Sequence, residues 1–369
     1  MKGSDPVPTN SSQALVSRFR AWVDWWRAAR AGVTLGDGLA RRADNFLLLR
    51  MLAAAMVIYG HAPHLAPAVH RVDFFVRKGW GHYSGDIAVD AFFLISGFLV
   101  TGSWLRQKSF YRFIKARFLR VVPAFFLNVT LLALVFGAAF TTLNLHDYYA
   151  APGTWHYITQ NLKYSPAMAW TLPGVFEHGM KASTINGAQW TLPAEVRMYA
   201  LLGALAATGL LRSARATAVA GVALLLGGWL HPEWFPLLPD WFRLGGFFAI
   251  GVLAYQYRNE IRLTLGGVVA LVLLAVLTCH LPTYAVTFPL ALAAVVFALA
   301  YLTPPLTWLD RHGDPSYGIY LWGWPSQQVV AWALPGAGLL EHVALALLLA
   351  CLLGYASWHG VERWALRLK

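Results

Sequence analysis

Ten apolar stretches of membrane-spanning length divide most of this chain, and they constrain its fold more than any other feature. A helix needs about 17 to 25 predominantly apolar residues to cross the hydrocarbon core. Charged residues make up only 12% of the 369 positions, roughly half the fraction usual in a soluble domain. The sequence therefore predicts an all-α polytopic membrane protein with about ten transmembrane helices, near 45–64, 86–105, 119–140, 192–211, 214–231, 241–257, 263–281, 284–302, 315–334 and 340–359.

The distribution of Lys and Arg predicts the orientation of these helices. With the N-terminus in the cytoplasm, 21 of the 29 Lys and Arg residues fall on the cytoplasmic side, as the positive-inside rule expects. Both termini are then cytoplasmic, and residues 141–191 form one large extracytoplasmic loop. The net charge of +12 follows from this topology, so no nucleic-acid partner is expected.

The first 44 residues precede the first span and lack the apolar core of a signal peptide. Leu15, Phe19, Trp22 and Trp26 recur at helical spacing, with arginines on the other faces. This pattern is typical of an amphipathic helix lying on the membrane surface, and a poorly ordered tail is the alternative. We expect a cytoplasmic segment over 1–44 and a transmembrane domain over 45–369.

Two ionisable residues, Arg50 and His61, lie inside the first span. An ionised side chain within a membrane is costly and marks a functional site by default. Eleven helical residues cover roughly 16 Å of rise and three turns plus about 20°. Both side chains therefore share one face at two depths, and a ligand that contacts both must be long.

Near the extracytoplasmic side, Asp90 and Glu195 each lie about one turn inside their spans, at the predicted depth of His61. A histidine flanked by carboxylates suits general acid–base chemistry. We therefore predict His61, Asp90 and Glu195 as catalytic residues. A buried ion cluster that only holds helices together is the structural alternative.

Near the cytoplasmic side, Arg117 and Arg120 lead into the third span and lie close to the predicted depth of Arg50. Guanidinium groups at two depths suit a phosphorylated ligand, although the positive-inside rule alone explains most basic residues of the loop. Coenzyme A fits this geometry, because an anionic head is joined to a long arm that ends in a thioester. The residues thus favour transmembrane acyl transfer, and no metal-ligand spacing is present.

The loop 141–191 is rich in Trp, Tyr, Pro, Gly and Asn, and a hairpin is expected around Val175–Trp190. Aromatic and amide side chains suit sugar binding, so Trp170, Asn186 and Trp190 are candidate ligands for a carbohydrate acceptor. Aromatic residues also gather at any membrane–water interface, and that alternative stays open.

Five sequence blocks, in order, resemble the acyltransferase-3 family of integral membrane O-acyltransferases over most of residues 45–365. They are the Arg50 and His61 pair, GDIAVDAFFLISGFLVTGSW, FIKARFLRVVPAF, NGAQWTLPAEVRMYALLG and DPSYGIYLWGWPSQQ. Many members have His where this chain has Gly323, so a role for that histidine is not expected here.

The resemblance implies that His61 is catalytic, with Glu195 and Asp90 as partners, and that Arg50 helps to hold acetyl-CoA or another acyl-CoA. Ser316, Tyr317 and Tyr320 would line the donor side. It also implies a bacterial inner-membrane protein that acylates a polysaccharide, peptidoglycan or lipid-linked sugar, with polysaccharide-assembly proteins as candidate partners.

Three alternatives stay open at this stage. The transfer is either direct or passes through an acyl-His61 intermediate. A transporter or flippase of a lipid-linked sugar or other anionic substrate would also use charged groups at the midplane, although the internal repeats and paired broken helices typical of transporters are not visible. A catalytically inactive scaffold is the third reading.

Overall fold

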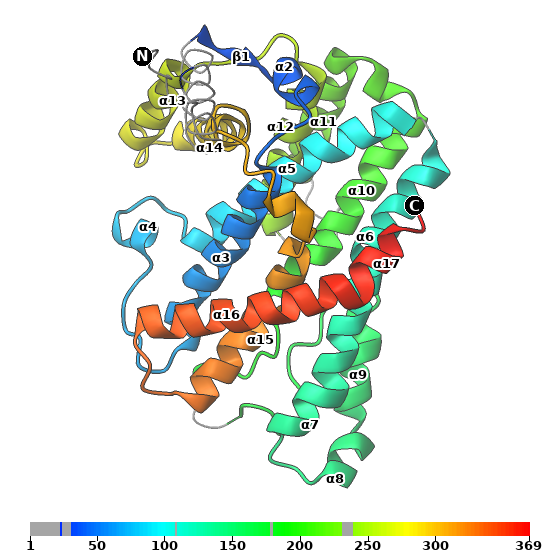
Figure 1. The fold of residues 1–369 in the computed structure, drawn as a ribbon, viewed down its shortest axis with the longest axis vertical. Helices are drawn as coiled ribbons and strands as arrows, with labels where there is room; N and C mark the ends of the chain where they lie inside the picture. Colours follow the sequence, from blue (N-terminus) through cyan, green and yellow to red (C-terminus); the bar gives the residue numbers. More distant parts are fainter. Residues whose placement is uncertain (1–22, 24–30, 108, 178–179, 231–238) are drawn as a thin grey trace, which may run out of the picture. The chain divides into compact units, whose positions relative to one another are not determined.

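The structure is a computed structural model that describes residues 23, 31–107, 109–177, 180–230 and 239–369 (Figure 1). The residues of the predicted amphipathic helix, Leu15, Phe19, Trp22 and Trp26, lie outside this part of the chain. Within it, the protein is helical, and its strands form one two-stranded sheet.

Every one of the ten predicted apolar stretches contains a helix, so the helical prediction is confirmed. The ten helices are α3 (Phe46–Leu65), α5 (Ser84–Gln107), α6 (Phe110–Leu131), α10 (Leu192–Ala207), α11 (Ala214–Leu230), α12 (Pro239–Gln256), α13 (Leu265–Leu277), α14 (Tyr284–Tyr301), α15 (Ser316–Ala333) and α16 (Leu339–Ser357).

Five helices in the described part of the chain are long and apolar enough to cross a membrane. They cover Phe46–Leu65, Ser84–Gln107, Phe110–Phe140, Tyr284–Tyr301 and Leu339–Leu366. The helices α10, α11, α12, α13 and α15 do not reach this combination of length and apolar content. The structure therefore supports a polytopic membrane protein, and the count of ten spans stays a prediction.

Short elements connect these helices: β1 (Val33–Thr34), α2 (Leu35–Ala40), α4 (Phe74–Arg77), η1 (Leu132–Phe136), α7 (Gly137–Phe140), α8 (Leu145–Ala150), α9 (Pro152–Asn161), η2 (Gly187–Thr191), η3 (Leu210–Arg212), β2 (Arg262–Leu263), η5 (Leu309–His312), η6 (Trp358–Glu362) and α17 (Arg363–Leu366). The contacts divide the chain into two compact units. The larger unit is Leu47–Gln256 with Trp308–Lys369, and the smaller joins the N-terminal part, up to Phe46, with Tyr257–Thr307.

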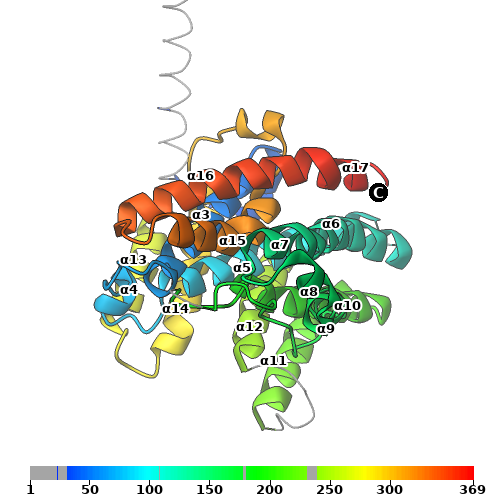
Figure 2. The same cartoon turned by 90° about the horizontal axis from the view of Figure 1, so that it is seen from below.

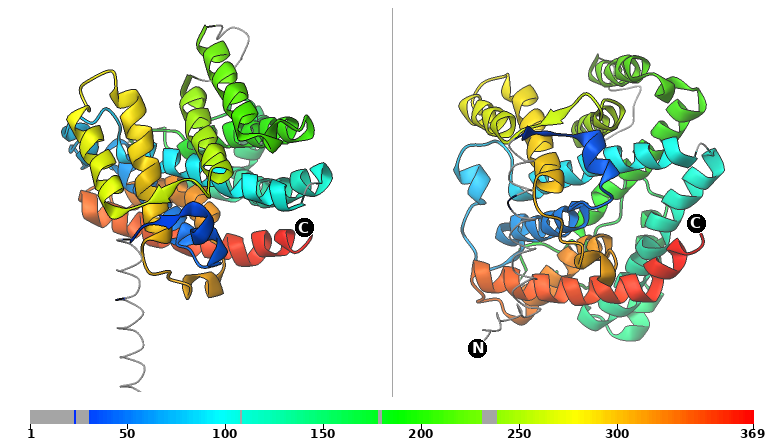
Figure 3. Two further views of the ribbon diagram at one scale, coloured as in Figure 1. Left: turned by 90° about the horizontal axis from the view of Figure 1, so that it is seen from above. Right: turned by 45° about the horizontal axis from the view of Figure 1, so that its top comes forward.

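The smaller unit is built around a helical hairpin. Helices α13 and α14 pack against each other (yellow in Figure 3), and β1 pairs antiparallel with β2. The hydroxyl of Thr34 caps α2 by accepting a hydrogen bond from the backbone N–H of Asp37. Such a cap satisfies an N–H that has no partner within the helix.

Two glycines let α5 and α12 pack closely in the larger unit. A methyl group on Gly97 would lie 2.1 Å from the carbonyl oxygen of Phe248, and one on Gly251 would lie 2.1 Å from that of Leu94. Only a residue without a side chain fits such a backbone contact. Helices α15 and α16 also pack side by side (Figure 2), with Gly318 against Gly354.

The helix that begins with α6 widens into a π-helical turn at η1 before it continues as α7. Two tyrosines of α8 bind carbonyl groups of this turn: the hydroxyl of Tyr148 donates to Ala133 (2.6 Å), and that of Tyr149 donates to Leu134 (2.7 Å). Part of the loop 141–191 is therefore a folded layer against α6. The predicted hairpin is not formed by the described residues of 175–190, because Val175 bridges to Thr141 instead and 187–191 are helical.

The tight α5–α12 contact yields a stability prediction. Gly97→Ala should destabilise the protein by about 1–3 kcal/mol, because overpacking a tight contact forces backbone shifts. Thermal unfolding in detergent would measure this change. Gly246→Ala on α12 is the matched control, since a methyl group there meets nothing within 4 Å. Equal melting temperatures for the two variants would contradict the close-packing account.

Candidate functional site

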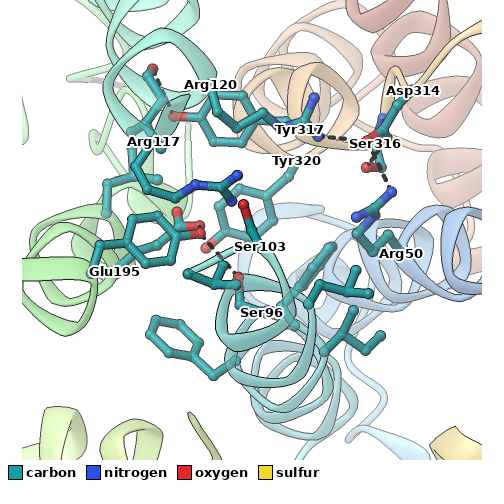
Figure 4. A pocket seen from close by; sticks show the side chains of 18 of the residues that line it. Arg50, Ser96, Ser103, Arg117, Arg120, Glu195, Asp314, Ser316, Tyr317 and Tyr320 are labelled. Atoms are coloured by element: carbon teal, nitrogen blue, oxygen red, sulfur yellow. Dashed lines mark hydrogen bonds and ion pairs between the residues drawn. The ribbon is translucent and has the colours of Figure 1, made fainter. Parts of the chain in front are cut away.

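A cavity of about 500 Å³ lies within the larger unit (Figure 4). Its walls come from α3, α5, α6, α10, α15 and the C-terminal segment. All six residues predicted for the donor side line it: Arg50, Arg117, Arg120, Ser316, Tyr317 and Tyr320. The structure thus brings together groups from three helices that are distant in sequence.

One carboxylate joins two of these guanidinium groups. Asp314 Oδ2 lies 2.9 Å from Arg50 Nη2 and 2.7 Å from Arg120 Nη2, while its Oδ1 accepts hydrogen bonds from the hydroxyl and backbone N–H of Ser316. Burial raises the pKa of the Asp314 carboxyl, but Arg120, Arg50 and Ser316 outweigh burial and hold that pKa well below its usual range. Asp314 is therefore ionised at neutral pH and fixes the spacing of both arginines.

A second carboxylate reaches Arg120 from the C-terminal helix. The helix of α16 widens into a π-helical turn at η6, and Glu362 at the end of that turn lies 3.8 Å from Arg120 Nη1. The hydroxyl of Ser357 donates to Glu362 at 2.9 Å. π-Helical turns are often found at functional sites. The sequence analysis missed both Asp314 and Glu362, although Asp314 opens the block DPSYGIYLWGWPSQQ.

The cavity carries an excess of positive charge. Arg106, Arg117 and Lys369 line it together with Arg50 and Arg120, whereas its lining carboxylates are Asp314 and Glu195. Burial, and next the positive charges of Arg117 and Arg120, lower the pKa of the Lys369 ammonium to about 8. Cations that disfavour one another in this way favour an anionic ligand.

Glu195 lies in this cavity, and the structure does not place it beside His61. Its carboxylate accepts a hydrogen bond from the hydroxyl of Tyr199, which lies 3.0 Å from the hydroxyl of Ser96. The Arg117 guanidinium lies 5.8 Å from the centre of the Tyr199 ring. The prediction that Glu195 flanks the histidine is thereby corrected: it shares a chamber with the donor-side residues.

Asp90 is also not a partner of His61. It is fully buried and forms an ion pair with Arg243 Nη1, while Arg243 Nη2 lies 3.1 Å from Asp86. Asp86, Asp90 and Gly97 share the face of α5 that packs on α12, since residues four and seven apart lie on one side of a helix. Arg243 comes from α12 and was not among the predicted site residues.

His61 lies beyond the cavity, among aromatic rings. Its Nε2 is 3.2 Å from the hydroxyl of Tyr83, its ring lies edge-on to Trp324 at 4.8 Å, and only 8% of the residue is exposed. Its Nδ1 has no hydrogen-bond partner among the described residues. Burial, and next the nearby charge of Asp86, raise the pKa of Tyr83, so the group that orients the imidazole is a neutral phenol.

Tyr320 lines the cavity and lies on the same helix as Trp324, the neighbour of His61. It follows Ser316 by one helical turn and precedes Trp324 by another, so all three share one face of α15. The Tyr320 hydroxyl lies 2.7 Å from Thr191 Oγ1 and donates to the carbonyl of Ala188 at 2.9 Å, and its ring contacts Phe92 at 5.6 Å. The cavity therefore extends along α15 as far as Tyr320, and His61 is not among the residues that line it.

The candidate acceptor residues do not line the cavity. Asn186 is 1% exposed, and its amide donates to the carbonyl of Leu321 and to Asn128. Trp190 and Trp170 are half-buried, and the ring of Trp170 packs against the aromatic core of the loop layer. Asn186 therefore anchors the loop to α15, because its hydrogen-bonding groups are already used.

Residues 181–191, which we term the strap, run across the His61 end of α3 and α15. Lys181 Nζ donates to the carbonyls of Val69 and Pro63, and Trp324 Nε1 donates to that of Thr184 (2.9 Å). The amide of Gln328 donates to the same carbonyl of Thr184 and to Ala182. The strap thus holds the Trp324 ring beside His61, and its end binds Tyr320.

The site is a cationic cavity in a helical protein whose apolar helices support a polytopic membrane protein. The chain belongs to the acyltransferase-3 family, because the family model described as an acyltransferase domain matches residues 45–359. Nodulation protein 10 of Rhizobium leguminosarum bv. viciae is 29% identical, over 88% of this chain and 94% of the relative. The O-acetyl transferase of Shigella phage Sf6 is 26% identical, over 87% of this chain and 96% of the relative. No solved structure matches the chain.

The shared carboxylate yields a prediction with a defined pH dependence. Asp314→Asn should lower the free energy of unfolding by about 2–4 kcal/mol at pH 7, because removing one member of a buried ion pair leaves the other unpaired. A carboxyl with a depressed pKa contributes stability above its ordinary pKa of about 3.9 and loses it as the pH falls further. Thermal unfolding in detergent between pH 7 and pH 3 would measure both effects.

In that experiment the difference between the wild type and Asp314→Asn should shrink below about pH 4, where the unfolded carboxyl takes up protons. Asp310→Asn, on the exposed turn η5, is the control. A difference between the wild type and Asp314→Asn that is independent of pH would contradict the assigned charge of Asp314.

Proposed function

We propose that the protein is a membrane-embedded O-acyltransferase that moves an acyl group from acyl-CoA to a carbohydrate hydroxyl. The coarser activity, O-acyl transfer, is supported by the family and by the O-acetyl transferase relative. The observation that carries the finer proposal is the convergence of Arg50, Arg117 and Arg120 on one cavity whose lining extends to Tyr320. Tyr320 is one helical turn from Trp324, which contacts His61.

Acyl-CoA is the donor that suits this cavity. Phosphate groups pair well with guanidinium groups, which offer several donors in a fixed plane. The pantetheine arm is long and uncharged. It therefore suits the end of the cavity that is lined by the aromatic rings of Tyr320 and Phe92. The distribution of Lys and Arg supports a cytoplasmic Arg50 end and an extracytoplasmic His61 end. The donor would then enter from the cytoplasm, and the acceptor from the other side.

His61 is the proposed general base. It would take the proton from the acceptor hydroxyl while the hydroxyl oxygen bonds to the acyl carbon and the carbon–sulfur bond breaks. The leaving thiolate would recover that proton from the imidazolium. With Nε2–H donating to Tyr83, the unpartnered Nδ1 is the nitrogen that accepts the proton.

The arm reaches His61 only after the Tyr320 side chain moves. The barrier at Tyr320 keeps the thioester away from the extracytoplasmic water until the acceptor arrives, which limits hydrolysis of the donor. The strap binds both Tyr320 and Trp324. Movement of the strap on acceptor binding would therefore displace the Tyr320 side chain and expose His61 at the same time. A surface polysaccharide, peptidoglycan or lipid-linked sugar fits as the acceptor, at a bacterial inner membrane.

His61→Ala should reduce acceptor-dependent release of CoA by about 10²–10⁴-fold, the usual contribution of a general base. It should leave CoA affinity unchanged, because His61 does not line the cavity. Both are measured on detergent-purified protein with acetyl-CoA and a glycan acceptor. His156→Ala, on the exposed face of α9, is the control.

Wild-type rates in His61→Ala would exclude the base assignment. Binding of CoA without any release on addition of an acceptor would instead favour the transporter alternative.

A further inference from the structure

Glu195 is an unusual residue for a cavity that attracts anions. Within the described part of the chain, Asp314 and Glu362 each lie within 4.0 Å of a guanidinium nitrogen, whereas Glu195 forms no such ion pair. The charges of Arg117 and Arg120 reach Glu195, but no guanidinium nitrogen of the described residues lies at ion-pair distance from it, so its negative charge still disfavours a phosphate group beside it. The role of Glu195 is therefore different from that of the other two acidic residues.

The two oxygens of Glu195 have different surroundings. Oε1 accepts the hydrogen bond from Tyr199, which also contacts Ser96. Oε2 accepts no hydrogen bond from the described residues, and Glu195 is only half-buried and lines the cavity. One oxygen is thus held in place by the protein, and the other is open to a ligand.

Glu195 lies toward the Tyr320 end of the cavity. It occupies the first turn of α10, one turn after Thr191, whose hydroxyl contacts Tyr320. The ion pairs of Arg50 and Arg120 with Asp314 lie one turn further back along α15, at Ser316. A ligand with its phosphates at Arg50 and Arg120 would therefore present its arm, not its head, to Glu195.

We propose that Glu195 binds an amide N–H of the pantetheine arm and thereby sets the direction in which acyl-CoA lies in the cavity. This inference rests on the proposed function. The arm carries two amide N–H donors, and a carboxylate accepts such a donor in a charge-assisted hydrogen bond. Repulsion between Glu195 and phosphate disfavours the reversed orientation, in which the thioester would point away from His61.

The test compares CoA with adenosine 3′,5′-bisphosphate. CoA has both head and arm, whereas the bisphosphate is the nucleotide of the head without the arm and without the second phosphate of the 5′-diphosphate. Glu195→Gln should weaken CoA binding about tenfold, equivalent to about 1.4 kcal/mol, and Glu195→Ala should weaken it further. Neither should weaken binding of the bisphosphate, measured by calorimetry on the full chain in detergent. Arg120→Gln should weaken both ligands.

Two controls separate this inference from a loss of folding and from a failure of the proposed function. Glu341→Gln removes an exposed carboxylate on α16 and should change neither affinity. Tyr199→Phe frees Oε1 and should produce a smaller loss for CoA alone. Equal losses for both ligands in Glu195→Gln, or none for CoA, would overturn the role of Glu195. If wild-type protein bound neither ligand, the acyl-CoA proposal itself would fail.

Discussion

The carboxylate of Asp314 is the interaction on which the site depends. Arg50 comes from α3 and Arg120 from α6, and a guanidinium in an apolar bundle is stable only when it is paired. By binding both through one oxygen, Asp314 fixes the two helices against the start of α15. Both arginines also line the cavity, so the groups that stabilise the bundle also give the cavity its positive charge.

The sequence predicted the helices and the donor-side residues, because both follow from local rules. Apolar length predicts a helix, and arginines within α6 and α3 must find polar surroundings. The sequence could not predict which acidic side chain pairs with which basic side chain. The sequence places Asp90 and Glu195 at similar depths in the membrane. Their neighbours, however, depend on how each helix is rotated about its own axis. Gly97 lets one face of α5 pack closely on α12, and this contact places Asp90 beside Arg243.

The same limit applies to the strap. The composition of its residues predicts a sugar-binding loop. In the structure, however, the Asn186 amide donates to the carbonyl of Leu321, and the carbonyl of Thr184 accepts a hydrogen bond from the Trp324 ring. The aromatic and amide content of this loop thus reflects its packing over α15. What the sequence could not indicate is that one segment binds both Trp324, beside His61, and Tyr320, at the end of the cavity. In the proposed function, that double attachment would couple access of the acceptor to access of the donor.

The central claim is that the arm of CoA extends from the arginines toward Tyr320 and Phe92. Exchange between the mixed disulfide of CoA with 2-thiopyridine and single introduced cysteines, after replacement of Cys279 and Cys351 by Ala, tests it most directly. The introduced thiol attacks the CoA sulfur and pyridine-2-thione leaves, which requires contact between the two sulfurs. Phe92→Cys at the far end should form the mixed disulfide, read by intact mass, and Arg106→Cys at the cationic lining should not. Preferential reaction at position 106 would contradict the account.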